Sequence, residues 1–147
     1  MSLSNLKIFL QLIAIAHIAG GILLPFLVNT QLFSTYNTLV NQALGFETTG
    51  KTAEINFLIG LFGPTIASWG VLFLYVVTTA FRNPDKRGWW TIFACCILWA
   101  PYDSILSIQR EIYINALINL ISALTILIPL FMAKKYFFRS SNSQFNA

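Results

Sequence analysis

The chain has 147 residues, of which 56% are hydrophobic and only 10% are charged, and its mean hydropathy is +0.70. This composition excludes an ordinary soluble domain and is typical of an integral membrane protein of one domain. The formal charge of +4 does not indicate a nucleic-acid partner, because the basic residues flank apolar stretches, where anionic lipid attracts them.

Four apolar stretches are each long enough to cross a hydrocarbon core, which needs about 20 helical residues. They predict transmembrane helices at about 6–28, 55–81, 89–108 and 112–132. We therefore expect an all-α membrane protein, a four-helix bundle in a single domain over 1–147, with a cytoplasmic tail at 133–147. The first stretch exceeds the apolar core of a secretory signal, so we expect it to remain as the first helix.

The connection after the first stretch carries a helical pattern of its own. Over about 31–44, apolar residues from Leu32 to Leu44 recur at three- and four-residue steps, and Asn37 and Asn41 occupy the opposite face. This pattern predicts an amphipathic helix that lies at the outer membrane interface and ends at Gly45.

The second stretch carries small and polar residues on one helical face. They recur at three- and four-residue spacings and are Asn56, Gly60, Gly63, Ala67 and Gly70. Because apolar side chains gain nothing by leaving lipid, small residues that let backbones approach are a main route to helix association. The face therefore predicts close packing against another helix.

The third and fourth stretches are joined by a tight turn at Gln109–Glu111, so we expect them to be antiparallel neighbours. Trp89 and Trp90 open the third stretch, where indole rings are expected at the membrane–water boundary. Asn115 and Asn119 share one face of the fourth stretch and are expected to hydrogen-bond between helices.

The basic residues sort to one side of the four stretches. With a cytoplasmic amino terminus, the cytoplasmic side holds Lys7, Arg82, Lys86, Arg87, Lys134, Lys135 and Arg139. The other side holds only Lys51 and Arg110. Positive charge collects on the cytoplasmic side of membrane proteins, so both termini are predicted to be cytoplasmic.

Polar residues inside the stretches are the candidates for a site, because polar groups at that depth are costly. The candidates for a pocket or an intramembrane polar cluster are His17, Trp99, Asp103, Ser107, Arg110, Asn115 and Asn119. His17 is either a neutral imidazole bonded to a neighbouring helix or a proton acceptor and ligand contact. Asp103 either pairs with Arg110 (or is protonated) and holds the bundle, or it faces a pocket open to the outer leaflet.

No metal, cofactor or catalytic residue is expected. A lone histidine cannot complete a zinc site, and the adjacent Cys95 and Cys96 lack the spacing of ligands. Neighbouring thiols on a helix point in different directions, so we expect both cysteines to serve packing.

Three functions stay open at this point. The patterns favour an accessory or scaffold membrane subunit without enzymatic activity, whose partners are the lipid bilayer and another membrane protein or a second copy of the chain. The alternative is a binder or carrier of a small lipophilic ligand in an outer-leaflet polar pocket. A lipid-modifying enzyme with His17 and Asp103 as an acid–base pair is favoured least. The mutual geometry of His17, Asp103 and Asn119 discriminates among them.

The segment from His17 to Pro25 reads HIAGGILLP and precedes the long connection. Together with chain length and helix count, this plan resembles the small bacterial four-helix inner-membrane proteins of the DoxX-like type. The resemblance implies a helical bundle in a bacterial inner membrane, sometimes associated with redox or quinone-linked partners. It carries over no catalytic residue, because the chain has no cysteine or charged motif for such an activity.

Overall fold

The computed structural model describes residues 1–45 and 52–138, and all of its long elements are helices. In chain order these are α1 (Leu3–Leu27), the 3-10 helix η1 (Gln31–Phe33), α2 (Ser34–Ala43), α3 (Thr52–Ala80), α4 (Lys86–Gln109) and α5 (Tyr113–Phe138). Four of them, α1, α3, α4 and α5, are long and apolar enough to cross a membrane. The predicted all-α, multi-pass membrane protein is thus confirmed at this level. Lys51, Arg139 and the end of the tail lie outside the described residues.

The last helix extends beyond its expected end at residue 132, because its aromatic end packs onto the bundle. Phe137 is buried and meets the ring of Phe81 edge to face, with ring centroids 4.9 Å apart. The ammonium of Lys134 lies 5.5 Å from the ring centroid of Trp89. These contacts keep the segment helical to Phe138, where the charge pattern alone suggested a tail.

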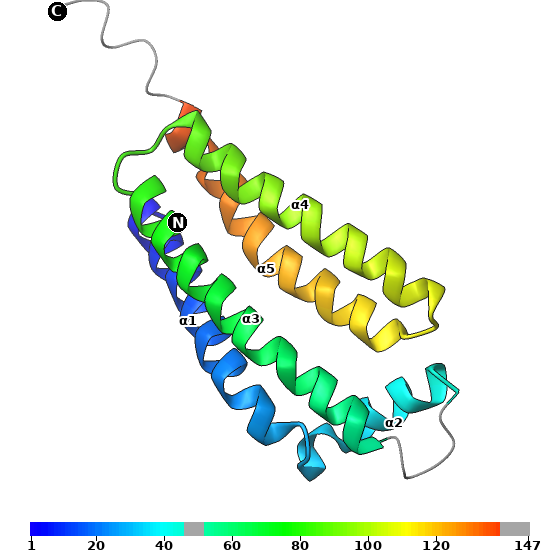
Figure 1. Ribbon diagram of the computed structural model, residues 1–147. Coiled ribbons are helices and arrows are strands. Elements are labelled where there is room, and N and C mark those ends of the chain that lie inside the picture. The colour runs from blue at the N-terminus through cyan, green and yellow to red at the C-terminus, as the bar shows by residue number, and fades with distance from the viewer. Residues whose placement is uncertain (46–51, 139–147) are drawn as a thin grey trace, which may run out of the picture.

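The four long helices form two pairs, α1 with α3 and α4 with α5 (Figure 1). The chain runs α1, α2, α3 before it crosses to the second pair, so α2 connects the two members of the first pair. The turn at residues 110–112 joins α4 directly to α5 as the sequence predicts, and the two helices are antiparallel neighbours.

Glycine lets the backbones of α1 and α3 touch. A Cβ atom added to Gly63 would lie 2.5 Å from the carbonyl oxygen of Gly21, and one added to Gly70 would lie 2.8 Å from the amide nitrogen of Ile18. A Cβ on Gly21 would overlap the backbone of Ala67. The predicted close packing along the small-residue face of 55–81 is therefore confirmed, with α1 as its partner.

The buried apolar residues that join the two pairs lie in the halves of the helices nearest the chain termini. They are Leu6, Leu10 and Ala14 of α1, Phe73, Val77 and Ala80 of α3 with Phe81 beyond it, Trp89, Ile92 and Cys96 of α4, and Ile126, Leu130, Ala133 and Phe137 of α5. Figure 1 shows the two pairs meeting at this end and separating toward α2. The pairs are thus joined through half of their length.

Trp89 belongs to this core, which corrects the expectation of a boundary position. Its side chain is 2% exposed, its indole N–H donates to the carbonyl oxygen of Leu130 at 3.0 Å, and its ring stacks on Phe93. Only Trp90, which is 53% exposed, is free to reach a boundary. The two rings diverge because consecutive residues of a helix point about 100° apart.

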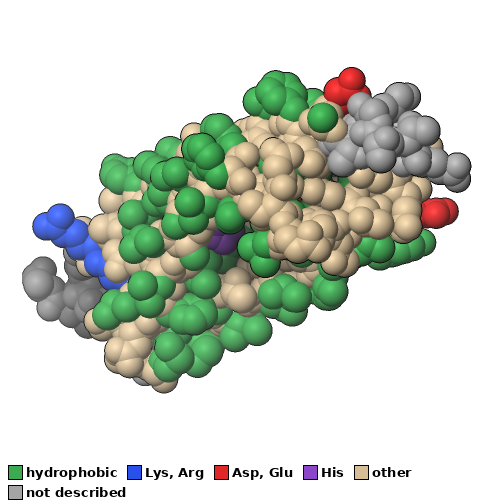
Figure 2. All heavy atoms as spheres, turned by 90° about the horizontal axis from the view of Figure 1, so that it is seen from below, with side chains coloured by type: hydrophobic (Ala, Val, Ile, Leu, Met, Phe, Trp, Pro, Cys, Tyr) green, Lys and Arg blue, Asp and Glu red, His purple; other side chains and the backbone are tan. Residues whose placement is uncertain are grey.

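Charge separates along the bundle. Figure 2 shows Lys and Arg side chains at one end of the visible face and Asp and Glu side chains at the other, with hydrophobic side chains between. The amino terminus of α1, the turn between α3 and α4, and the end of α5 share one end, whereas α2 and the turn between α4 and α5 share the other (Figure 1). We call these the basic end and the α2 end.

Alanine at two adjacent positions of α1 tests the close contact with α3. Gly21→Ala should lower the free energy of unfolding by about 1–3 kcal/mol, because its methyl group would overlap the α3 backbone. Gly20→Ala has no atom within 4 Å and should be neutral or stabilising by up to about 1 kcal/mol. Unfolding of both variants in one detergent measures the difference. Equal stabilities would contradict a backbone contact at Gly21.

Candidate functional site

Four of the polar residues singled out in the sequence meet between α4 and α5. The amide nitrogen Nδ2 of Asn119 donates to Oδ2 of Asp103 at 2.8 Å. Nδ2 of Asn115 lies 3.4 Å from the same oxygen and donates to Oγ of Ser107 at 2.8 Å. We call these four residues the Asp103 cluster.

The cluster follows from helix geometry and one tight turn. Asp103 and Ser107 are four residues apart on α4, and Asn115 and Asn119 are four apart on α5, so each pair lies on one face. The turn reverses the chain at Glu111, whose φ of 59° lies in the left-handed region, and the N–H of Ile112 donates to the Ser107 carbonyl at 2.9 Å. Two pairs at helical spacing therefore face each other across antiparallel helices.

The carboxylate of Asp103 keeps a free oxygen. Both amide contacts go to Oδ2, and Oδ1 accepts no hydrogen bond from the described residues. The expected pairing with Arg110 is replaced by these amides, because Arg110 caps the end of α4 and is exposed there. A carboxylate has about four acceptor positions, so Oδ1 can receive a donor from elsewhere.

Tyr36 of α2 lies near enough to this carboxylate to be affected by its charge. Burial, and then the negative charge of Asp103, raise the pKa of the Tyr36 hydroxyl above its ordinary value of 10.0. The electrostatic effect requires the two groups to lie near each other, so α2 brings a phenol to the α2-end side of the Asp103 cluster. A neutral phenol can donate a hydrogen bond.

His17 does not hydrogen-bond to the cluster. Its Nδ1–H donates to the carbonyl of Ile13 at 2.8 Å, which leaves Nε2 as an acceptor. The ring lies against Trp69 of α3, with centroids 4.9 Å apart, and Trp69 lies 6.1 Å from Trp99 of α4. An aromatic row thus runs from α1 through α3 to α4, and it ends one helical turn before Asp103.

These residues form one region between the two helix pairs, on the α2 side of the shared core. We call it the inter-pair site, and it comprises Tyr36, Asp103, and the aromatic row of His17, Trp69 and Trp99. Its side chains are only partly buried, and Trp99 is 36% exposed. Figure 2 shows the single histidine at the bottom of a hollow between hydrophobic side chains. The site is reachable from the surface.

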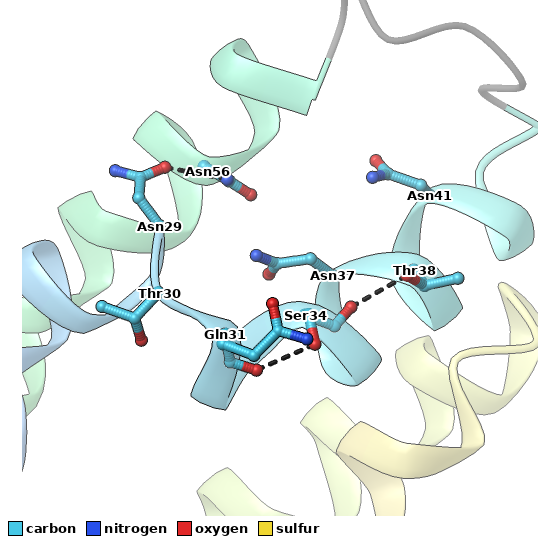
Figure 3. A pocket seen from close by; sticks show the side chains of 8 residues that line it. All are labelled: Asn29, Thr30, Gln31, Ser34, Asn37, Thr38, Asn41 and Asn56. Atoms are coloured by element: carbon cyan, nitrogen blue, oxygen red, sulfur yellow. Dashed lines mark hydrogen bonds between the residues drawn. The ribbon is translucent and has the colours of Figure 1, made fainter.

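A second polar region lies where α1, α2 and α3 meet at the α2 end. A hollow of about 330 Å³ is lined there by Asn29, Thr30, Gln31, Ser34, Asn37, Thr38, Asn41 and Asn56 (Figure 3). The side-chain oxygens of Asn37, Asn41 and Asn56 are buried without a partner. Each buried acceptor that goes unpaired costs about 1–3 kcal/mol. We call this region the asparagine pocket.

Sequence reasoning missed Tyr36, Trp69 and the pocket-lining role of Asn37. The sequence pattern predicts Asn37 on the polar face of an interfacial helix and indicates no site role for Tyr36 or Trp69. The structure instead buries Asn37, and leaves Leu32 76% exposed. The density of asparagine at positions 29, 37, 41 and 56 was the available signal.

No family model, curated protein or solved structure matches this chain. Among residues 1–45 and 52–138, no group of three or more His, Cys, Asp or Glu side chains is placed to hold a metal ion.

The electrostatic effect of Asp103 on Tyr36 predicts that the Tyr36 pKa depends on the Asp103 charge. Asp103→Asn should lower the Tyr36 pKa but leave it above 10.0, because burial is the larger cause of the shift. The pKa is read from tyrosinate absorbance, as the difference between each protein and its Tyr36→Phe counterpart. Asp85→Asn, at the basic end, is the control and should change nothing.

The same shift gives the pH dependence of stability. The folded state favours the neutral phenol, so this contribution is complete below a pH of about 10 and is lost as the pH rises through the raised pKa. An unchanged Tyr36 pKa in Asp103→Asn would contradict the proximity of the two groups.

Proposed function

We propose that this membrane protein binds a small lipophilic molecule, with a hydrogen-bond-donating polar end, at the inter-pair site. The observation that carries the proposal is the free, reachable Oδ1 of Asp103 beside a partly exposed aromatic row. A bundle that needed only to hold together would fill this region as it fills the basic end. Instead the side chains there are aromatic or polar and only partly buried.

The acceptors of the inter-pair site that have no donor indicate the chemistry of the ligand's polar end. Oδ1 of Asp103 and Nε2 of His17 accept nothing from the described residues. A hydroxyl or an amine on the ligand could donate to either atom. Oδ2 is already fixed by Asn119, and such support keeps the carboxylate in one orientation.

The aromatic row indicates that the rest of the ligand is apolar. Trp69, whose ring stacks on Phe73, and Trp99, which is 36% exposed, lie on opposite helix pairs with centroids 6.1 Å apart. Ligand sites combine aromatic walls with a few polar groups that fix orientation. His17 donates to Ile13 instead of pairing with Asp103, so the arrangement supports binding over acid–base catalysis.

Helix α2 covers the entrance in this proposal. The asparagine pocket lies on one side of α2, and a second hollow of about 320 Å³ separates it from the α4–α5 turn. Exposed Leu32 and Leu39 would face lipid, which supports a position of α2 at the membrane interface as an amphipathic segment. A helix with hollows on both sides can shift without disturbing a packed core.

Orientation in the membrane is part of the proposal. All described Lys and Arg residues except Arg110 lie at the basic end, which supports cytoplasmic termini and an inter-pair site open to the outer leaflet. The resemblance to DoxX-like proteins stays an architectural prediction, and no residue of the proposed site depends on it. An accessory-subunit role remains the competing function.

Ligand retention tests the proposal. The chain is purified in a mild detergent and extracted with organic solvent, and the released small molecules are identified by mass spectrometry. The wild type should retain one lipophilic class at near one molecule per chain. Asp103→Asn should retain about tenfold less, since a hydrogen bond to a charged group is lost.

The control is Asp85→Asn, which removes a carboxylate at the basic end. Asp85 caps α4 by accepting the N–H of Gly88 at 2.7 Å, and asparagine caps equally well. This variant should retain ligand as the wild type does. Unfolding of Asp103→Asn, or extracts that match bulk lipid in every sample, would support the accessory-subunit function instead.

A further inference from the structure

The asparagine pocket presents buried oxygen atoms that face no partner. Asn37 is 7% exposed and Asn56 is 8% exposed, and the side-chain oxygen of each is unpaired. Figure 3 shows their amides and that of Asn41 around the same hollow. Buried polar groups are nearly always paired, so three unpaired acceptors in one pocket indicate a missing donor.

The orientation of the Asn37 amide is fixed by its other end. Nδ2 of Asn37 donates to the backbone carbonyl of Val28 at 2.7 Å, and a carbonyl oxygen can only accept a hydrogen bond. Nδ2 of Asn56 donates to Oδ1 of Asn29 at 2.9 Å, which is a bond between two amides. Turning the Asn37 amide around would place two acceptors together. Its oxygen must therefore be the atom that is left unpaired.

The hydroxyl groups of the lining add further acceptors. Thr30, Ser34 and Thr38 each donate their proton to a backbone carbonyl, at 2.6, 2.8 and 2.9 Å. A hydroxyl whose proton is committed has only lone pairs left to offer. These three hydroxyl groups therefore add acceptors to the lining of the pocket.

We infer that the asparagine pocket binds a primary ammonium group, R–NH₃⁺, carried by an amphiphile such as an aminophospholipid. An ammonium brings three N–H donors, and the pocket presents three unpaired amide oxygens. Glu54 in the first turn of α3 and Glu111 in the α4–α5 turn add negative charge at the α2 end, where the chain's positive charge is sparse.

The size of the hollow argues against a bare metal ion. About 330 Å³ is at the lower limit of pockets that hold small organic ligands, and far larger than an ion needs. The lining contains no carboxylate, which calcium sites normally require. A small organic cation fits both the volume and the neutral oxygens.

A lipid is the favoured carrier of the ammonium because of the surroundings. Phe26 is 74% exposed and Leu32 is 76% exposed, and they flank the pocket-lining residues from 29 to 31. Acyl chains could lie along these side chains. The exposed amides of Asn29 and Gln31 could donate to a headgroup phosphate. This inference does not rest on the function proposed for the inter-pair site.

The test compares a lipid whose headgroup amine has N–H groups with one whose headgroup amine is fully methylated. The purified chain is offered an equimolar mixture of phosphatidylethanolamine and phosphatidylcholine with identical acyl chains, and retained lipid is counted by native mass spectrometry. The two headgroups carry the same charge, but only the first has N–H donors. We expect about tenfold preference for phosphatidylethanolamine, as for a charge-assisted hydrogen bond.

Asn41→Ala is the site variant, and Gln42→Ala is its matched control on the same helix. The buried oxygen of Asn41 has no partner, so its removal breaks no hydrogen bond of the fold. Gln42 is exposed and lines the other hollow. The preference should fall several-fold toward parity in Asn41→Ala and persist in Gln42→Ala. It should also persist in Asp103→Asn, which separates this site from the inter-pair site.

Soluble ethanolamine distinguishes the sources of the amine. The melting temperature is measured in phosphatidylcholine micelles with and without millimolar ethanolamine. If ethanolamine raises the melting temperature of the wild type but not that of Asn41→Ala, a soluble amine binds the same pocket. Equal retention of the two lipids together with no effect of ethanolamine would overturn the inference. The pocket would then hold only water.

Discussion

The contact between the backbones of α1 and α3 is the constraint on which the rest of the bundle depends. Lipid gives apolar side chains no reason to leave it, so helices associate where small residues allow close approach. Gly21 and Gly63 meet so closely that neither position could carry a Cβ without displacement. This contact fixes α1 and α3 as one unit, although the connection that contains α2 separates them in the sequence.

The second unit, α4 with α5, is held by other means, which explains why the two ends of the bundle differ. At the basic end, Trp89 of α4 donates to the Leu130 carbonyl of α5, and both residues belong to the buried core that the second unit shares with α1 and α3. Toward the α2 end, α4 and α5 are joined by the amides around Asp103, and among the described residues the aromatic row, in place of a buried apolar cluster, links them to α1 and α3. The inter-pair site and the asparagine pocket both lie in this less tightly packed half.

The helices and the small-residue face were predictable, because hydropathy and three- and four-residue spacing act within one segment. The Asp103 cluster was also predictable in part, since its members repeat at helical spacing on either side of a short turn. The residues from α2 and α3 were not, because burial of Asn37 and the approach of Tyr36 to Asp103 depend on how α2 docks. The turn at Gln109–Glu111 was predicted, but the left-handed φ of Glu111 was not, as glycine is the usual residue at such a φ.

The most direct test of two units joined at one end is a pair of distances measured by pulsed electron paramagnetic resonance in lipid nanodiscs. The two native cysteines are first removed as Cys95→Ser and Cys96→Ala. One protein then carries spin labels at exposed Ile8 and Lys135, at the basic end, and a second protein carries them at exposed Leu23 and Leu117, toward the α2 end. We expect a shorter and narrower distance distribution for the labels at the basic end than for the labels toward the α2 end. Equal distributions at both ends would show a uniformly packed bundle and contradict this expectation.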